Sequence, residues 1–232
     1  MNRAPLPVPG VTHARRCSWI IWDWNGTLLD DTCAGLNAFN AQLTKRGCKP
    51  ITFEFYREHF AFPVKPFYAL CGIDHDREDW DRIAREYHDA YAREPKALNR
   101  ETIAALERVK TAGVRQCILS ALKQDLLDAA IDEAGIRKYF DFIYGTDNLD
   151  GGSKTGRARE LMRRLCAAGR ESRPVRNDIV LIGDSIHDKE VADALGVRCI
   201  LCAQGSHSAE RLRAVAPTGN TLLEAVELAL RQ

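Results

Sequence analysis

The sequence lacks several features that mark special classes of protein. No apolar run approaches the roughly 18 residues that a membrane-spanning helix needs. Residues 1–16 contain no apolar stretch typical of a secretory signal, and we expect them to form a loose tail. An excess of one charge is also missing, because 33 Lys and Arg face 32 Asp and Glu, a net charge of +1. We therefore expect neither a nucleic-acid nor a membrane partner, and we predict a cytoplasmic location.

The eight cysteines do not form a recognisable metal or disulfide framework. The single C-x-x-C pattern joins Cys199 to Cys202 inside the apolar run VRCILCA, which predicts a buried strand. Positions three apart on a strand face opposite sides, so these two thiols cannot hold one ion together. A chain of 232 residues with 45% hydrophobic residues has no need of disulfides for its stability. We predict reduced thiols packed in a core.

Most of the chain alternates short apolar runs with helical patterns. This alternation indicates βαβ units and predicts an α/β fold with a doubly wound, mostly parallel sheet. Several helical patterns end at a glycine, a common helix C-terminal stop, namely Gly113, Gly135, Gly169 and Gly196. The predicted strands are Cys17–Trp22, Val114–Leu119, Phe142–Tyr144, Asp178–Ile182 and Arg198–Cys202, and the predicted helices are Thr102–Thr111, Lys123–Ala134, Lys154–Ala168, Asp188–Leu195 and Asn220–Leu230.

The region from Asp31 to Asn99 departs from this alternation and contains no convincing strand. Helical patterns cover Thr32–Arg46, Thr52–His59 and Glu78–Arg93, with the loop FAFPVKP between them. The length suits one domain with a large insertion. We therefore predict a tail at 1–16, an α/β core made of 17–30 and 100–232, and an α-helical cap at 31–99.

Polar residues follow three of the predicted strands directly. Asp23 comes after SWIIW, Ser120 after QCIL and Asp184 after VLIG. Ligands of open parallel sheets bind beyond the carboxyl ends of the strands, so these side chains are expected to converge on one crevice.

These segments and their order resemble the haloacid dehalogenase-like hydrolase superfamily. The chain has DWNGT from Asp23, Ser120 after a strand, Lys154 after two glycines, and GDSIHD containing Asp184 and Asp188. The family's four motifs are D-x-D-G-T, a Ser or Thr, a Lys, and G-D-x-x-x-D. The match runs from about residue 17 to 205, and the helical insertion falls where the family places its cap. The finer resemblance is to phosphoglycolate-phosphatase-like members.

The resemblance implies Mg²⁺-dependent hydrolysis of a small phosphorylated metabolite, with Asp23 as the nucleophile that forms an aspartyl-phosphate. Carboxylates repel a phosphate dianion, so the site needs cations, and Mg²⁺ suits oxygen ligands. The implied metal ligands are the carboxylate of Asp23, the backbone carbonyl of Asn25 and the carboxylates of Asp184 and Asp188, the last directly or through water.

The resemblance also implies which residues bind the phosphate. Lys154 would pair with the phosphate and with Asp23. Ser120 and the backbone N–H groups of Gly26 and Thr27 would hold phosphate oxygens. Such groups position a transferring phosphoryl group electrostatically.

Asn25 departs from the family pattern, which usually has an Asp that protonates the leaving oxygen. An amide has no exchangeable acidic proton near neutral pH, so Asn25 cannot do this. General acid–base catalysis is worth roughly 10²–10⁴ in rate, a serious loss that does not abolish phosphate hydrolysis. Three interpretations follow: a substrate with a good leaving group such as an acyl or aryl phosphate, proton transfer by His187 or a cap residue, or a long-lived aspartyl-phosphate.

Two other functions stay open at this stage. A phosphonatase would use a cap lysine, and Lys45, Lys49, Lys65 and Lys96 are available. A dehalogenase needs no Mg²⁺, so the intact G-D-x-x-x-D disfavours it. A catalytically weak phosphate-binding regulatory module would also explain Asn25. Lys65 or Arg57 could face an anionic substrate, His187 is expected to be exposed, and the sequence leaves the oligomeric state undetermined.

Overall fold

The structure is a computed structural model that describes residues 17–74, 76–147, 154–168 and 176–231. The predicted tail, the two glycines before Lys154 and the predicted helix stop at Gly169 lie outside these residues.

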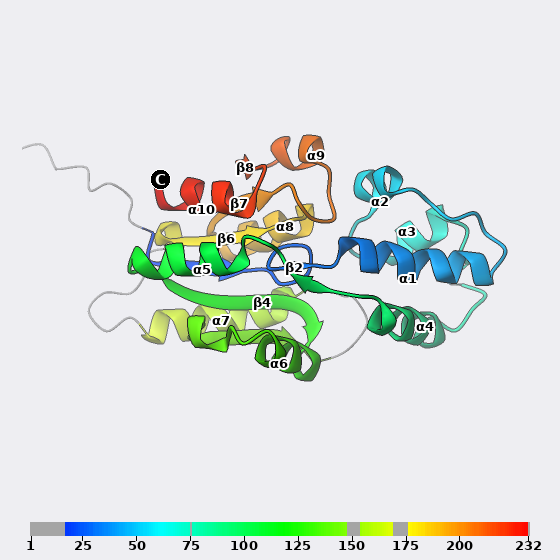
Figure 1. Ribbon diagram of the computed structural model, residues 1–232, viewed down its shortest axis with the longest axis horizontal. Coiled ribbons are helices and arrows are strands. Elements are labelled where there is room, and N and C mark those ends of the chain that lie inside the picture. Colours follow the sequence, from blue (N-terminus) through cyan, green and yellow to red (C-terminus); the bar gives the residue numbers. More distant parts are fainter. Residues whose placement is uncertain (1–16, 75, 148–153, 169–175, 232) are drawn as a thin grey trace, which may run out of the picture.

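A parallel sheet forms the centre of the core, as the alternating pattern predicted. Its six described strands lie in the order β5-β4-β1-β6-β7-β8, all parallel, with β1 and β6 side by side in the middle. Their carboxyl ends point towards the cap helices (Figure 1). The strands are β1 (Trp19–Trp22), β4 (Arg115–Lys123), β5 (Phe142–Thr146), β6 (Ile179–Gly183), β7 (Arg198–Cys202) and β8 (Thr218–Gly219).

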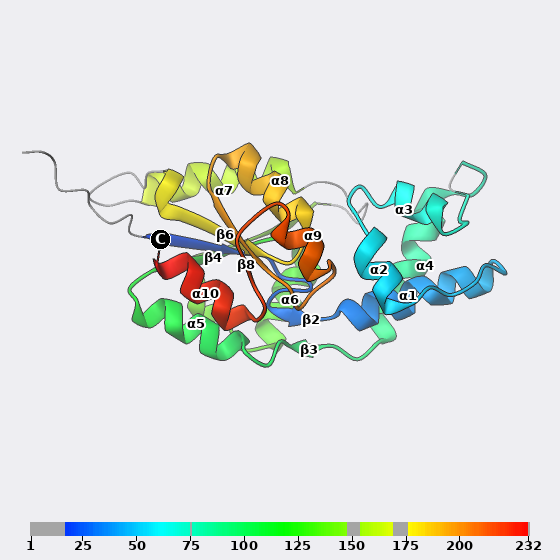
Figure 2. The same cartoon turned by 90° about the horizontal axis from the view of Figure 1, so that it is seen from above.

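Helices cover both faces of this sheet (Figure 2), which makes it doubly wound. Side chains of β1 alternate between two separate apolar clusters: Ile20 and Trp22 pack with α5, α6 and α10, while Trp19 and Ile21 pack with α7, α8 and α9. The helices of the core are α5 (Thr102–Thr111), α6 (Gln124–Glu133), α7 (Thr155–Ala168), α8 (Ile186–Leu195), α9 (Ala209–Arg213) and α10 (Leu222–Arg231), with short 3₁₀ turns η1 (Arg137–Tyr139) and η2 (Arg176–Asp178).

The cysteines are free, as predicted. Cys199 and Cys202 are both buried on β7, and they belong to the two different apolar clusters. They therefore face opposite sides of the sheet, and their spacing is that of core residues.

Four helices lie beyond the carboxyl edge of the sheet, at the right of Figure 1. They are α1 (Thr32–Lys45), α2 (Phe53–His59), α3 (Lys65–Leu70) and α4 (Trp80–Arg93), and they share an apolar cluster of their own around Phe39, Leu43 and Phe67. The chain leaves and re-enters the core through β2 (Leu29–Asp30) and β3 (Ala97–Leu98), which pair antiparallel. We refer to residues 31–99 as the cap, and this division stays a prediction.

The structure differs from the sequence prediction in its shortest elements and, by one to four residues, in the ends of most of the others. The sequence pattern predicted none of α3, α9, β2, β3 and β8, because two to six residues are too few to display a period. β4 also runs past its predicted end at Leu119 to Lys123, with a register shift between these residues. Among the described residues, no helix is long and apolar enough to cross a membrane.

Candidate active site

Two neighbouring strands deliver the first two carboxylates of the site. Asp23 follows β1 and Asp184 follows β6, and the two strands pair in register, so their ends lie side by side. Asp188 joins them from the first turn of α8. All three are buried, and one carboxylate oxygen from each lies within 4.8 Å of the others.

Lys154, directly before α7, places its ammonium among these carboxylates. Its Nζ donates to Asp23 Oδ1 at 2.5 Å, to Asp188 Oδ1 at 2.7 Å and to the Leu119 carbonyl at 3.2 Å. All three protons of the ammonium are thus used, and the side chain is 2% exposed. One buried cation therefore faces three buried carboxylates, and the site has an uncompensated negative charge.

The pKa values follow from this imbalance. Burial raises the pKa of Asp23 well above its usual range, against the attraction of Lys154. Burial and the charge of Asp188 raise the pKa of Asp184 to about 7. Burial alone would raise the pKa of Asp188, but its contact with Lys154 lowers it below the ordinary value. The pKa of Lys154 is raised above its usual value, because the attraction of Asp188 and Asp23 outweighs burial.

The Thr27 hydroxyl lies between one carboxylate oxygen of Asp23 and one of Asp184. The Thr27 hydroxyl lies 3.3 Å from Asp23 Oδ2 and 3.4 Å from Asp184 Oδ1. Ser206, in the loop after β7, holds the other Asp184 oxygen through its N–H at 2.5 Å and its hydroxyl at 2.6 Å. Gly26 has φ +74°, and a Cβ there would lie 2.4 Å from Asp184, so the turn after β1 requires glycine.

Asp188 has a second role at the start of α8. Its Oδ2 accepts hydrogen bonds from the N–H and the hydroxyl of Ser185 at 3.1 and 2.7 Å. The Asp188 N–H donates in return to the Ser185 hydroxyl at 3.4 Å, which completes a capping box. Both oxygens of Asp188 are thereby engaged, one by Lys154 and one by Ser185. This arrangement favours Asp188 as the group that orients Lys154.

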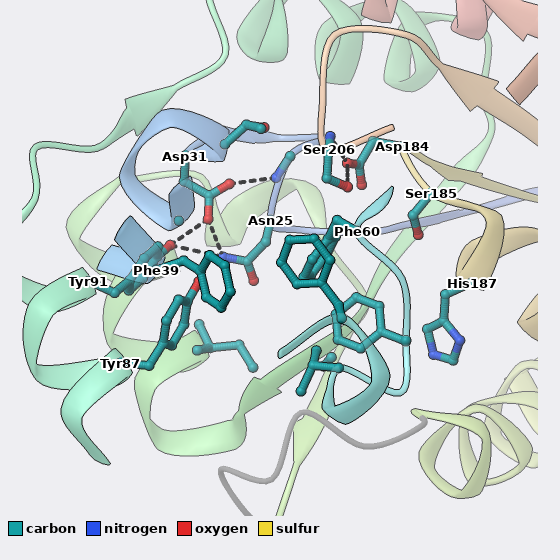
Figure 3. A pocket seen from close by; sticks show the side chains of 18 of the residues that line it. Asn25, Asp31, Phe39, Phe60, Tyr87, Tyr91, Asp184, Ser185, His187 and Ser206 are labelled. Carbon is teal, nitrogen blue, oxygen red and sulfur yellow. Dashed lines mark hydrogen bonds between the residues drawn. The ribbon is translucent and has the colours of Figure 1, made fainter. Parts of the chain in front are cut away.

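Asn25 is held by Asp31 and by a tyrosine of α4 (Figure 3). Its Nδ2 donates to Asp31 Oδ2 at 2.7 Å and to the Tyr91 hydroxyl at 3.0 Å, and Tyr91 donates to the same oxygen of Asp31 at 2.5 Å. Since a carboxylate only accepts, the amide N–H₂ must face Asp31 and the amide oxygen points into the cavity. The other Asp31 oxygen accepts from the Gly26 N–H at 2.6 Å.

A cavity of about 190 Å³ opens between these residues and the cap. The lining from the core includes Asp23, Lys154, Asp184 and Asp188, and the lining from the cap is largely aromatic. The acidic residues therefore face a space that α1–α4 help to enclose.

Most of the residues predicted for the site line the cavity, and Ser120 does not. Asp23, Asn25, Gly26, Lys154, Asp184 and Asp188 all line the cavity, with Thr27 between two of the carboxylates. Ser120 is buried within β4, where its hydroxyl accepts from the Leu122 N–H at 3.0 Å, and it is not one of the described lining residues.

The structure also places the candidate cations and histidines of the sequence analysis. The expectation that His187 is exposed is wrong: it is 8% exposed and lines the cavity beside Phe62. Arg57 donates to the carbonyls of Ala203 and His207, and Lys65 lies over the Trp80 ring. Neither Arg57 nor any of the four candidate cap lysines belongs to the described cavity lining.

Sequence reasoning missed Asp31, Ser185 and Ser206. The doubled acid at Asp30 and Asp31 was the available signal for the first, and Ser185 lies inside the fourth motif itself. Ser206 gave no signal, because its role depends on the loop after β7 folding back over Asp184.

The donor set suits a hard divalent cation. Three carboxylates offer oxygens within 4.8 Å of one another, and the negative charge exceeds what Lys154 supplies. Oxygen ligands of this kind are those that Mg²⁺ takes in phosphate-binding sites. Asp23 Oδ2 and Asp184 Oδ1 are the oxygens that could bind such a cation. Lys154 holds the other oxygen of Asp23, and Ser206 holds the other oxygen of Asp184.

A parallel sheet that delivers buried carboxylates and a lysine under a helical cover defines an α/β enzyme with its site at the carboxyl edge. Within that class, the chain belongs to the family of haloacid dehalogenase-like hydrolases, whose family model matches residues 20–202. It is therefore a hydrolase.

Individual relatives agree with this assignment. Phosphoglycolate phosphatase 1 of Pseudomonas aeruginosa is 26% identical over 208 residues, which cover 86% of this chain and 74% of the relative. A phosphoglycolate phosphatase of Caulobacter vibrioides is 24% identical and covers 83% of this chain and 82% of its own length. The crystal structure of a predicted phosphatase from Clostridium acetobutylicum superposes with a TM-score of 0.75 at 19% identity, over 94% of this chain and all of that one, which shows the shared fold.

Proposed function

We propose that the protein is a Mg²⁺-dependent phosphatase that acts on a small phosphorylated metabolite through an aspartyl-phosphate on Asp23. The observation that carries this proposal is the position of Asp23: it lies at the end of the central strand, 2.5 Å from a buried ammonium and open to the cavity. The similarity to phosphoglycolate phosphatases supports phosphate as the group transferred. Cytoplasmic location stays a prediction from the sequence.

The chemistry needs two displacements at phosphorus. A carboxylate oxygen of Asp23 forms a bond to phosphorus while the ester bond breaks and its electron pair leaves with the alcohol oxygen. Water then attacks the aspartyl-phosphate, which releases inorganic phosphate and regenerates the carboxylate. A bound Mg²⁺ would be held by the carboxylates of Asp23 and Asp184 and by the backbone carbonyl of Asn25, with Asp188 nearby. It would supply the positive charge that phosphoryl transfer requires.

Residues of this chain perform the remaining tasks. Lys154 holds one oxygen of Asp23 in place and offsets the repulsion between carboxylate and phosphate. The N–H groups of Gly26 and Thr27 were predicted as phosphate donors, but Gly26 donates to Asp31 at 2.6 Å and Thr27 donates to the Trp24 carbonyl at 3.3 Å. The hydroxyl of Ser120 remains a proposed phosphate donor. Asn25 presents an acceptor to the cavity, so it cannot protonate a leaving group.

The test measures phosphate release from a panel of phosphoesters and acyl phosphates, with Mg²⁺ and with EDTA. We expect Asp23→Asn to lose turnover by a factor of at least about 10³ and to lose the acid-quenched phosphorylated peptide that contains residue 23. The matched control is Asp30→Asn, since Asp30 is an exposed acid seven positions further on. Mg²⁺-dependent turnover that survives Asp23→Asn contradicts the proposal.

The other candidate functions predict different results in the same panel. A phosphonatase needs a cap lysine at the cavity, and none of the cap lysines is among the described residues that line this cavity. A regulatory module would bind phosphate analogues and release no phosphate from any compound.

A further inference from the structure

The cap side of the cavity is enriched in aromatic residues relative to the whole chain. Aromatic residues are 8% of the chain. Nine of the 26 described residues that line this cavity are Phe, Tyr or Trp. They come from all four cap helices and the loop after α2, and include Phe39, Tyr56, Phe60, Tyr68, Trp80 and Tyr87. Figure 3 shows the Asn25 amide reaching into this space, with Phe39, Phe60 and Tyr87 around it.

Among the described lining residues, which include His88 and His187, no unpaired Lys or Arg faces a second negative charge on the substrate. Among the described lining residues Lys154 is the one Lys or Arg, and its ammonium is already paired with Asp23 and Asp188. Asp31 adds another acid at the base of the cap, where it binds Asn25 and Tyr91. A carboxylate on the leaving group would lie desolvated without a cation, which is costly.

The space suits a single ring next to the phosphoryl group. The whole cavity, catalytic end included, has a volume of about 190 Å³, which is of the same order as the roughly 150 Å³ apolar cavity known to hold benzene. Gly35 on α1 helps to make this room, since a Cβ there would lie 3.2 Å from the Tyr87 hydroxyl and 3.5 Å from that of Tyr56. Tyr56 is 5% exposed, and its hydroxyl makes no hydrogen bond within the described chain, so it can bind a polar substituent on the ring.

We propose that the substrates of this enzyme are monophosphate esters of uncharged phenols. The proposal rests on the phosphatase function proposed above and names the class of leaving group. When Asp23 bonds to phosphorus, the bond between phosphorus and the phenolic oxygen breaks, and the phenolate leaves with the electron pair and takes a proton from water. A phenol has a pKa of about 10, far below that of an alkanol, so this step needs no general acid at position 25.

Substrates that differ in one feature at a time separate the effects of the ring, of a charge on the ring and of the leaving group on the rate. We expect kcat/KM for phenyl phosphate to exceed that for para-carboxyphenyl phosphate and for phosphoglycolate by at least about tenfold each. Benzyl phosphate, which keeps the ring but releases an alkanol, is expected to be at least about tenfold slower than phenyl phosphate. Acetyl phosphate, a good leaving group without a ring, reports the chemistry alone.

One cap variant tests the charge argument directly. Val64→Arg places a cation on the cavity wall at the half-buried start of α3, and we expect it to narrow the preference for phenyl over para-carboxyphenyl phosphate by about tenfold. Ala69→Arg adds the same charge on the exposed side of α3 and is expected to leave the ratio unchanged. Hydrolysis of acetyl phosphate shows that each variant is folded.

A binding measurement distinguishes failure of this proposal from failure of the proposed function. With Mg²⁺ present, titration calorimetry should give a dissociation constant for phenylphosphonate at least about tenfold below that for phosphonoacetate. That preference without turnover of any substrate supports the ligand class and contradicts the phosphatase. Turnover with equal or better use of phosphoglycolate contradicts the phenol class and leaves the phosphatase intact.

Discussion

At the scale of single residues, the main finding concerns Asn25 and Asp31. The chain has an amide where the family usually has an acid, and it has an acid six positions later that binds this amide at 2.7 Å. Asn25 and Asp31 therefore form one hydrogen-bonded unit, with Tyr91 as the third member. A substitution at either position has to be interpreted with the other in view.

This pairing predicts that Asn25→Asp alone is destabilising. It would replace a donor by a second carboxylate oxygen against Asp31, and we expect a loss of about 1–3 kcal/mol in the free energy of unfolding by urea titration. The exchange Asn25→Asp/Asp31→Asn restores a donor–acceptor pair and should regain most of that loss. It should also raise the hydrolysis of alkyl phosphates by roughly 10²-fold, because an acid then faces the cavity. A single variant as stable as the exchange would argue against the pairing.

A second residue-scale prediction concerns the acidic cluster. Burial and Asp188 raise the pKa of Asp184 to about 7, so ionising Asp184 opposes folding when no cation is bound. We expect Asp184→Asn to melt at or above the wild-type temperature in EDTA, since its amide oxygen can still accept from Ser206. Wild type should gain several degrees with millimolar Mg²⁺, and the variant should gain little, by differential scanning fluorimetry. Equal Mg²⁺ shifts in both proteins would exclude Asp184 as a ligand.

At the scale of elements, the site depends on how strand ends and helix starts meet. β1 and β6 place Asp23 and Asp184 side by side, and α8 begins at the same edge with a capping box that fixes Asp188. The loop after β7 completes the arrangement, because Ser206 holds Asp184 and His207 accepts from the first N–H of α8 at 3.1 Å. These contacts connect the loop to the helix start that carries the fourth motif.

The contact of His207 with α8 predicts a pH dependence of stability. Burial, with a smaller contribution from Arg211, lowers the pKa of His207 from 6.5 to about 4. The unfolded chain therefore binds the proton first as pH falls. The contribution of neutral His207 is complete above about pH 6.5 and is lost progressively towards pH 4, by up to about 3 kcal/mol.

The measurement is urea unfolding between pH 4 and 7 of wild type and His207→Gln, whose amide oxygen can still accept from Ile186. Taking the difference between the two proteins removes the contributions of other groups, including Asp184, whose raised pKa acts with the opposite sign. Parallel curves for the two proteins would show that His207 does not titrate on unfolding.

At the scale of the whole molecule, the core and the cap have separate apolar clusters, joined by β2, β3 and the contacts around the cavity. In the proposed function, the core supplies the reacting carboxylates and Lys154. The cap supplies the aromatic walls, so we expect the chemistry and the choice of substrate to depend on different parts of the chain.

The exposure of the thiols across the whole molecule predicts how fast each reacts. All eight cysteines are free, and they differ in exposure: Cys33 is exposed, three are half-buried and four are buried. We expect a thiol reagent such as DTNB to modify one group rapidly in the native protein and eight in denaturant without reductant. Fewer than eight in denaturant would indicate a disulfide.

The central strands and the order of the motifs were predictable from the sequence, because apolar runs bounded by turn residues are local signals. β7 and α5 begin and end where predicted. The two-residue strands, α3 and α9 were not, since elements this short show no period. The environment of Ser120 was also missed, because the sequence did not show that β4 continues past it.

The sequence by itself determined the class of this protein: the alternation of strands and helices, and the acids and the lysine that follow the strands. These depend on residue type and spacing along the chain. Only the tertiary structure decided which groups meet across it: Asn25 with Asp31 and Tyr91, Asp184 with Ser206, and the aromatic cap residues around one cavity. Asn25 and Tyr91, for example, are 66 positions apart in the sequence. The contacts of Tyr91 and of the aromatic residues arise from the packing of the cap against the sheet edge, and that of Ser206 arises from the loop after β7. No local pattern encodes either arrangement.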